Sequence, residues 1–544
     1  MGLEKLGTLA DYPAETQSPA FSMSRREIEL KLEVPAHGLA RLGRSSLLKG
    51  ATTASRKPAT LVSVYFDTDK LKLRNKGFSL RVRRIGRRHV QTIKQHASED
   101  SPLFVRNEWE REIGSTQPDL DFAQDPALEL LLNKKLRRDL KPVFETHVRR
   151  TVYPIESDGS EIELTIDRGK LEAGRHSVPI CEIELELKSG QSAELFKIAR
   201  TLAKEIPLQL VVKSKAERGY AVLTGEKLKG VKAARVALSP DISRQVAFQL
   251  IARACLYQLA ANQPAMQGGD PEGVHQMRVA LRRLRAAISL FSEMLASPQT
   301  AAVKAEFKWI ARELGPVREL DVFIKRVLKP VSDGNPNGAG VAVLARDLQK
   351  QRGNAFARAL AAVESPRFRA LVLDAAAWIE AGEWTHQDNA LVRALRERPI
   401  APAAAEELHR RWKRILKRGK DLETLGPQRR HKLRIQAKKL RYASEYFTET
   451  FPGKKSARRC KRFVFSLEKL QDALGDLNDI AVHEGLTERL VDAQDGANDR
   501  RPRRASEAFA AGRLSGHEEA RGASVLGEAR HAYEAFARAK PFWS

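Results

Sequence analysis

The sequence predicts an α+β protein of several domains, in which an N-terminal closed antiparallel β-barrel with a few helices precedes a domain built only of helices. From residue 24 to about 225, short segments alternate apolar and polar residues, which is the pattern of half-buried strands in an all-β barrel. After Pro240, long runs rich in Ala, Leu, Arg and Lys continue to the end of the chain. A chain of 544 residues is also too long for one core, so we expect roughly two to four domains.

We divide the chain into four parts on this basis. Residues 1–23 lack periodicity and are expected to be a disordered leader, so that Met23 competes with Met1 as the start. Residues 24–225 make the barrel domain, 226–240 a linker, and 241–544 the helical domain.

Composition restricts the partners. The formal net charge is +27, which favours polyanions. Aromatic residues make up only 6%, so base-stacking platforms for nucleic acid are not expected. The three cysteines lack a paired spacing and no apolar run is long enough for a bilayer. We therefore expect a cytoplasmic protein without a membrane partner, and the sequence does not indicate its oligomeric state.

The first expected strand lies within Arg25–Val34. Glu27, Glu29 and Lys31 fall on one face of it, and aliphatic residues fall on the other. Later strands repeat this alternation of charged and apolar residues. The charged residues on the expected strands are Glu27, Glu29, Lys31, Arg81, Arg83, Lys94, Arg106, Glu108, Glu110, Arg150, Glu161, Glu163, Asp167, Glu182, Glu184 and Glu186, with Lys215 following them.

In a closed barrel one face of every strand points inward. If the charges faced solvent, the result would be an ordinary amphipathic barrel. If they faced inward, they would form a lumen of carboxylates, ammonium and guanidinium groups that is unstable when empty. A ligand carrying both signs, such as a metal-bound oligophosphate, would stabilise that lumen. The alternation itself fits both arrangements.

The order of these segments resembles the CYTH superfamily, the triphosphate tunnel metalloenzymes, over about residues 24–225. The matching segments are Glu27-Ile-Glu-Leu-Lys31, Tyr65-Phe-Asp-Thr68, Leu80-Arg-Val-Arg83, Thr92-Ile-Lys94, Glu108-Trp-Glu110, Ile166-Asp-Arg-Gly169, Cys181-Glu-Ile-Glu-Leu-Glu186 and Ser214-Lys-Ala-Glu-Arg-Gly-Tyr220.

The resemblance implies that some of these side chains bind metal and others bind triphosphate. The implied metal ligands are Glu27, Glu29, Asp167, Glu182 and Glu184, and the implied triphosphate ligands are Lys31, Arg81, Arg83, Lys94, Arg150 and Lys215. Glu27, Glu29 and Lys31 are the candidate catalytic residues. Arg150 is chosen over Arg149 by counting from Phe144, and Glu108, Glu110, Glu163 and Glu186 have no assigned role.

The chemistry implied is metal-assisted hydrolysis of a terminal phosphoanhydride, with Mg²⁺ or Mn²⁺ as the cofactor. The basic side chains would neutralise charge on the transferring phosphoryl group. No Walker-type glycine-rich loop and no Ser-His-Asp arrangement indicates a different mechanism.

The helical domain contains an internal repeat, with one copy in about 241–365 and a second in about 401–544. His275-Gln-Met-Arg-Val-Ala-Leu-Arg-Arg-Leu-Arg285 matches His431-Lys-Leu-Arg-Ile-Gln-Ala-Lys-Lys-Leu-Arg441. A second block, Leu314-Gly-Pro-Val-Arg-Glu319, matches Leu474-Gly-Asp-Leu-Asn-Asp479. The two matched blocks come in the same order, which predicts two related helical bundles.

Each copy of the first block carries a basic stripe about 80° wide on a helix. Its members are His275, Arg278, Arg282 and Arg285 in one copy and His431, Arg434, Lys438 and Arg441 in the other. The stripes are either solvated basic faces or a surface for a flexible polyanion. Residues 401–470 hold 21 Lys or Arg against 7 Asp or Glu, which favours the polyanion. The two histidines fit either a packing or a binding role.

The repeated blocks resemble the CHAD domain, a helical module of two four-helix repeats that is associated with binding inorganic polyphosphate. The resemblance covers about residues 241–544. It departs from strict symmetry at Asn478, where the first copy has Arg318, and at Ala481, where the first copy has Asp321.

Together the two resemblances predict an inorganic triphosphatase that hydrolyses tripolyphosphate to diphosphate and phosphate, with a C-terminal polyphosphate-binding domain. One alternative is a CYTH enzyme acting on thiamine triphosphate or nucleoside triphosphates, or cyclising adenylate. Another is a non-catalytic protein that binds polyphosphate granules. If the helical domain serves to localise the triphosphatase, the triphosphatase would also be found at such granules. The sequence does not rank the substrates.

Overall fold

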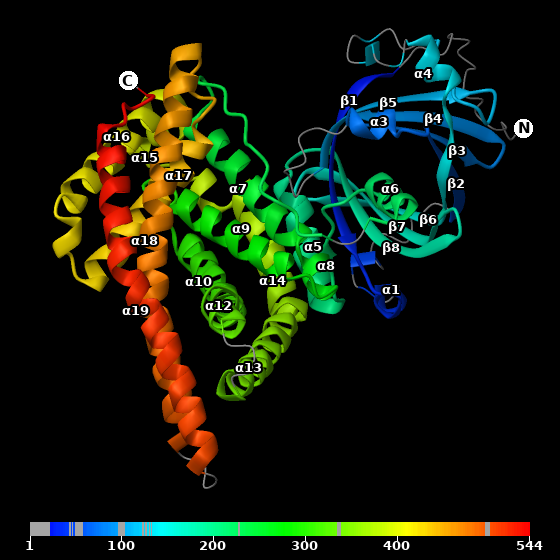
Figure 1. The fold of residues 1–544 in the computed structure, drawn as a ribbon. Helices are drawn as coiled ribbons and strands as arrows, with labels where there is room; N and C mark the ends of the chain where they lie inside the picture. The colour runs from blue at the N-terminus through cyan, green and yellow to red at the C-terminus, as the bar shows by residue number, and fades with distance from the viewer. Residues whose placement is uncertain are drawn as a thin grey trace, which may run out of the picture.

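The computed structural model describes residues 22–42, 45, 47–48, 58–95, 104–121, 125, 128–129, 131, 133–226, 229–334, 339–495 and 501–543. For residues 22–27, 104–106, 339, 484–495, 501–508, 511 and 517 the description is limited to the backbone. Of the expected disordered leader at 1–23, residues 1–21 lie outside the described residues, and Ser22 and Met23 instead begin a strand. A domain of antiparallel strands is followed by a helical domain, as predicted (Figure 1).

The strands form one antiparallel sheet that closes on itself. Around the ring the order is β1-β5-β4-β3-β2-β6-β7-β8, and β8 pairs with β1 again. Closure depends on β1, which pairs with β8 along one edge and with β5 and β9 along the other. The strands are β1 Ser22–Glu33, β2 Ala59–Asp67, β3 Phe78–Ile85, β4 Arg88–Gln95, β5 Phe104–Ile113, β6 Lys141–Ser157, β7 Ser160–Ala173, β8 His176–Ser189 and β9 Gln209–Leu210.

Much of the apolar face of the strands is buried on the outside of this ring, whereas Tyr65, which lines the interior, clusters with Phe144 and Tyr220. On one side Leu30, Leu185 and Leu164 pack beneath helix α5 (Ala193–Glu205). On the other side Leu80 and Trp109 pack in a separate core with residues of the segment between β5 and β6. The charged face of the strands is thereby turned inward. The remaining helices of this domain are α1 Ala36–Leu42, α3 Lys72–Asn75, α4 Lys134–Arg138 and α6 Lys215–Thr224.

The helical domain has its own extensive core. Its helices begin at residues that supply a cap, such as Ser243 before α7, Asp270 before α9 and Ser297 before α10, whose side chains accept backbone N–H bonds. The elements are α7 Arg244–Ala261, α8 Gln263–Gln267, α9 Pro271–Leu290, α10 Pro298–Glu313, α11 Gly315–Phe323, the π-helix η3 Ile324–Leu328, α12 Lys329–Asp333, α13 Ala339–Glu364, α14 Pro366–Ala381, η4 Glu383–Thr385, α15 Ala390–Glu397, α16 Ile400–Gly419, η5 Leu422–Thr424, α17 Pro427–Tyr446, α18 Lys454–Asp495 and α19 Arg501–Arg538.

The two copies of the repeat differ in one respect that bears on the site. The second block falls at the junction of α10 and α11 in the first copy, whereas in the second copy it lies inside the unbroken helix α18. Helices α18 and α19 run side by side and extend beyond the rest of the domain (Figure 1).

The two domains are packed against each other through α5 and α14. Arg200 on α5 lies 3.0 Å from Asp374 on α14, measured from Nε to Oδ1. No helix among the described residues combines the length and the apolar character needed to cross a bilayer.

Candidate functional site

The interior of the barrel is a charged cavity of about 910 Å³. Alternation along the strands aims Arg81 and Arg83 of β3, Lys94 of β4 and Glu108 of β5 into it. Lys94 Nζ lies 2.8 Å from a Glu108 carboxylate oxygen. Of the predicted site residues, those lining the cavity are Glu29, Lys31, Arg81, Arg83, Lys94, Arg150, Glu184 and Lys215.

Three carboxylates converge at one wall of this cavity. Asp167 on β7 and Glu182 and Glu184 on β8 are all buried and each place an oxygen within 4.8 Å of the others. Lys215, at the start of α6, lies between them, with Nζ 2.9 Å from Asp167, 2.6 Å from Glu182 and 2.7 Å from Glu184. Arg218, one turn further along α6, also pairs with Glu182. Helix α6 therefore supplies the cations that hold this acid cluster together.

The two neighbouring strands, β6 and β1, add two further cations to the cluster. Arg150 on β6 donates from Nε and Nη2 to Asp167, at 2.7 and 2.6 Å, and from Nη2 to Glu184 at 2.7 Å. Lys31 on β1 donates to Glu29 at 2.8 Å and to Glu184 at 2.7 Å. Glu184 thus accepts from Lys31, Arg150 and Lys215 together, which makes it the centre of the network.

The protonation states follow from this pairing. Burial alone would raise the pKa of Glu184, but Lys215, Lys31 and Arg150 hold it well below its ordinary value. The pKa of Asp167 is lowered too, because Lys215 and Arg150 outweigh its burial. Burial together with Arg81 and Arg150 lowers the pKa of Arg83 to about 9. Arg83 is therefore a cation under repulsion, and a phosphate group beside it would relieve that repulsion.

The acid cluster also fits a divalent cation. Oxygen ligands are what Mg²⁺ and Mn²⁺ take, and Asp167, Glu182 and Glu184 offer three at metal-binding separation. Glu29 Oε1 is buried without a hydrogen-bond partner among the described residues. A buried carboxylate oxygen in that state is costly unless a cation or donor reaches it.

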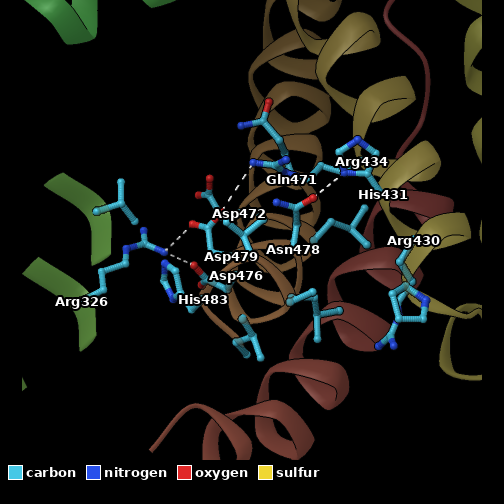
Figure 2. A pocket seen from close by; sticks show the side chains of 18 of the residues that line it. Arg326, Arg430, His431, Arg434, Gln471, Asp472, Asp476, Asn478, Asp479 and His483 are labelled. Atoms are coloured by element: carbon cyan, nitrogen blue, oxygen red, sulfur yellow. Dashed lines mark hydrogen bonds and ion pairs between the residues drawn. The ribbon is translucent and has the colours of Figure 1, made fainter. Parts of the chain in front are cut away.

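A second charged cavity, of about 1500 Å³, lies in the helical domain. His275, Arg278 and Arg282 reach it from α9, and His431, Arg434 and Lys438 reach it from α17. Figure 2 shows Arg434 and His431 opposite Arg326, with residues of α18 between them. The two predicted basic stripes are therefore brought together around one space.

Several cations of this second cavity are incompletely neutralised. Among the described residues, His275 Nδ1 and the Nε atoms of Arg278, Arg282 and Arg434 are buried without hydrogen-bond partners. Burial and the neighbouring Arg434 and Arg282 lower the pKa of Lys438 to about 7. Burial, Arg282 and Arg318 likewise lower the pKa of Arg278 to about 10. Such a cluster carries an electrostatic cost that a bound polyanion would remove.

Comparison with known families agrees with both halves of this description. The model of the CYTH domain matches residues 25–220, and the model of the CHAD domain matches residues 250–488. The chain is a CYTH domain followed by a CHAD domain. This confirms the family resemblances predicted from the sequence.

Individual relatives are similar to parts of the chain. An inorganic triphosphatase of Haemophilus influenzae is 31% identical over 211 residues, which is 37% of this chain and 56% of that protein, so the match spans little more than half of the relative. The CHAD domain of the plant Ricinus communis is 29% identical, with a TM-score of 0.47, over 57% of this chain and 97% of that one. A putative adenylyl cyclase from Hippeastrum with a dominant triphosphatase activity is 19% identical, with a TM-score of 0.28, over 37% of this chain and 96% of that one.

The structure places most predicted tunnel residues in or directly beneath the CYTH cavity. Asp167 and Glu182 lie under its wall, where they are 0% and 1% exposed. The backbone of Glu27 belongs to β1, but its side chain lies outside the described residues. Of the glutamates without an assigned role, Glu108, Glu110 and Glu186 line the cavity, while Glu163 lies beside Lys188, with the two charged groups 4.0 Å apart.

Sequence reasoning assigned no role to Tyr65 or Arg218. Tyr65 is 3% exposed, lines the cavity and stacks on Phe144 with ring centroids 4.5 Å apart. Although burial would raise its pKa, the cations Arg81, Arg83 and Lys215 lower it. The signal was available, because Tyr65 is part of the quoted Tyr65-Phe-Asp-Thr68 segment.

In the CHAD cavity six of the eight predicted stripe residues are lining residues. The other two, Arg285 and Arg441, are not; Arg441 instead donates to Gln471 Oε1 at 2.7 Å and pairs with Glu445. Arg318, Arg326 and Arg430 line the cavity without having been predicted to do so. Arg318 belongs to the second repeated block, which was noted for its position but not for its charge.

Proposed function

We propose that the CYTH domain is a metal-dependent inorganic triphosphatase that hydrolyses tripolyphosphate to diphosphate and phosphate. The observation that carries the proposal is the tunnel itself, where buried cations and buried carboxylates face one cavity. A linear triphosphate needs cations along its length, and its divalent metal needs carboxylates beside it. The inorganic triphosphatase among the relatives supports this choice of substrate.

The basic residues of the tunnel would bind the triphosphate and neutralise its charge. Arg81, Arg83 and Lys94 would hold the phosphate chain, because these cations line the part of the tunnel around β3 and β4. Lys31, Arg150 and Lys215 lie next to the acids and would neutralise the phosphoryl group that is transferred to water. Hydrolysis adds one water across the terminal P–O–P bond and releases phosphate and diphosphate.

The carboxylates would hold Mg²⁺ or Mn²⁺. Asp167, Glu182, Glu184 and Glu29 supply the oxygens, with Glu27 as a further candidate on the same strand face. A divalent cation bound there would polarise the phosphate oxygens and lower the pKa of a bound water.

Phosphate release from tripolyphosphate, ATP and thiamine triphosphate, each with Mg²⁺ and with Mn²⁺, tests this proposal. We expect tripolyphosphate to be the best substrate and Lys31→Ala to lose activity by about a hundredfold or more. Lys170→Ala is the matched control, since Lys170 pairs with Glu172 on the barrel exterior and is 53% exposed. Preference for another triphosphate would change the substrate, and release from none would favour the non-catalytic granule-binding alternative.

We further propose that the CHAD cavity binds inorganic polyphosphate, which would place the enzyme in the cytoplasm at polyphosphate granules. The Nε atoms of Arg278 and Arg282, which are buried without a hydrogen-bond partner among the described residues, support a long, dense anion as the ligand. Binding of long-chain polyphosphate by the Lys31→Ala protein should weaken steeply as salt increases, since it releases counter-ions. Salt-insensitive binding, or none, would refute this part.

A further inference from the structure

The two copies of the CHAD repeat contribute unequal charge to the cavity, although their basic stripes match. Among the described lining residues, the first copy contributes four arginines and one carboxylate, and the second contributes four cations and four carboxylates. The first set is Arg278, Arg282, Arg318 and Arg326 with Glu319. The second set is Arg430, Lys432, Arg434 and Lys438 with Asp472, Asp476, Asp479 and Glu519.

The difference originates in α18. Asp472, Asp476 and Asp479 are spaced four and three residues apart, so they share one face of this helix. That face is turned to the cavity, as Figure 2 shows. At the corresponding positions 160 residues earlier the first copy has Arg312, Pro316 and Glu319. The acidic stripe is therefore a property of the second copy.

The acidic stripe already has cationic partners. Arg326, which comes from the first copy, pairs with Asp476 and lies 3.5 Å from Asp479. Asp479 also lies 3.9 Å from Arg434. Arg434 thus faces a carboxylate on the α18 side before any ligand is present.

The equivalent arginine of the first copy, Arg278, has different neighbours. Its guanidinium donates to the Ala311 carbonyl at 3.3 Å. Burial, Arg282 and Arg318 lower its pKa, and Glu319 only partly offsets them. The acids Glu272 and Asp321 lie behind this wall, where Gln276 and Arg352 donate to them at 2.6 and 2.7 Å. The first-copy wall therefore presents mainly cations to the cavity.

The histidines show the same asymmetry. His431 is hydrogen-bonded through Nδ1 to the Asn478 side chain. His275, its counterpart, has a buried Nδ1 without a hydrogen-bond partner among the described residues. Burial and Arg318, the counterpart of Asn478, lower the pKa of His275. Where the second copy has a neutral, paired contact, the first copy has an extra cation.

We propose that polyphosphate binds along the first-copy wall, made by His275, Arg278, Arg282 and Arg318 with Lys438 at its edge, and that the acidic stripe on α18 keeps the polymer away from the second-copy wall. This rests on the proposed binding of polyphosphate by the CHAD cavity. A phosphate beside Arg278, which is less compensated by acids, relieves repulsion, whereas a phosphate beside Arg434 must compete with Asp479 and approach two further carboxylates.

The pseudo-symmetry supplies the experiment, because Arg278 and Arg434 occupy the same position of the repeated block. Affinity for long-chain polyphosphate is measured at fixed salt on the full chain carrying Lys31→Ala, so that the tunnel does not hydrolyse the polymer. We expect Arg278→Gln to lower the affinity at least tenfold and Arg434→Gln to lower it no more than about threefold. Asp479→Asn should raise it several-fold.

A control and a second comparison separate charge from folding. Glu306→Gln removes a carboxylate that pairs with Arg367 at 2.7 Å outside the cavity, and it should leave the affinity unchanged. Arg318→Gln should weaken binding without a change in thermal unfolding, since its counterpart is already the neutral Asn478. Equal losses for Arg278→Gln and Arg434→Gln, or weaker binding by Asp479→Asn, would overturn the asymmetric wall. Absence of binding by the parent protein would instead refute the proposed function of the cavity.

Discussion

Replacing Lys215 by methionine tests the electrostatics of the tunnel most directly. Lys215 is 8% exposed, and its ammonium lies within 2.9 Å of three carboxylates, Asp167, Glu182 and Glu184. Methionine keeps much of the volume but leaves three buried acids short of one cation. Removing one member of a buried ion pair costs about 3–5 kcal/mol. Because Arg150 continues to bind two of these acids, we expect a loss near the lower figure, about 3 kcal/mol of unfolding free energy.

The loss should depend on pH and on metal. Glu184 and Asp167 have lowered pKa values in the folded protein, so their contribution to stability is present at neutral pH and is lost as the pH falls through those values. Lys215→Met should bring the pKa values of both acids up, and the stability difference should shrink below about pH 5. A divalent cation at about 100 times its dissociation constant restores about 2.7 kcal/mol, so saturating Mg²⁺ or Mn²⁺ should recover most of the loss.

The assay must report on the barrel alone, because two domains need not unfold together. Hydrogen exchange of peptides from β7 and β8 in increasing urea, with and without Mg²⁺, meets that need. Lys197→Met is the control, because this exposed lysine also lies near two acids, at 3.2 Å from Glu194 and 3.6 Å from Asp158. Its replacement should change the unfolding free energy very little. A Lys215→Met loss that is the same at pH 4.5 and pH 7.5, and is indifferent to metal, would refute this account of the acid cluster.

Three further outcomes are expected. Polyphosphate affinity should fall above pH 7, by at most about tenfold per pH unit. The reason is that Lys438 has a pKa of about 7 in the empty cavity and the anion favours its charged form. Lys438→Arg should remove most of that pH dependence in a fluorescence titration between pH 6.5 and 9. Gly169→Ala should destabilise the barrel by several kcal/mol in urea unfolding, since an added Cβ would lie 1.9 Å from the His147 carbonyl oxygen of the neighbouring strand; wild-type stability would contradict that packing. Tripolyphosphate without metal should raise the melting temperature of the barrel by relieving repulsion around Arg83, and an equal rise in Arg83→Gln would show that the anion binds elsewhere.

The lining of the tunnel could be predicted from the sequence because strand alternation is local. Once Leu80 and Val82 are taken as buried in the core, Arg81 and Arg83 must face the other way. The many short strands predicted a closed barrel, but not which strands close it, since the pairing of β1 with β5 joins residues far apart in the chain. The position of Lys215 among three acids has the same origin. Lys215 follows the last long strand, and only the packing of α6 into the barrel brings it there.

In the helical domain the helical periodicity correctly placed the basic residues on one face of each helix. It placed Arg282 and Arg285 on one stripe, but angle says nothing about position along the helix axis, where each residue adds 1.5 Å. The cavity ends before Arg285 and Arg441. The acids of α18 were missed for a different reason: Asp472, Asp476 and Asp479 belong to another helix, and which of its faces meets α17 is decided by tertiary packing.

The two sites handle buried charge in opposite ways, and this difference bears on how each selects its ligand. In the tunnel nearly every predicted cation already has an acid partner, as Lys215 and Arg150 show, so a bare anion gains only the relief of repulsion around Arg83. It gains more when a divalent cation takes over the carboxylates at the same time. Metal and triphosphate should therefore bind cooperatively. In the CHAD cavity the cations around Arg278 and Arg282 have fewer acid partners, so we expect an anion of sufficient charge density to bind there without metal. A polymer held first in the cavity and hydrolysed only where metal is present would be a consequence of these two arrangements, with the first step sensitive to salt and the second to the divalent cation.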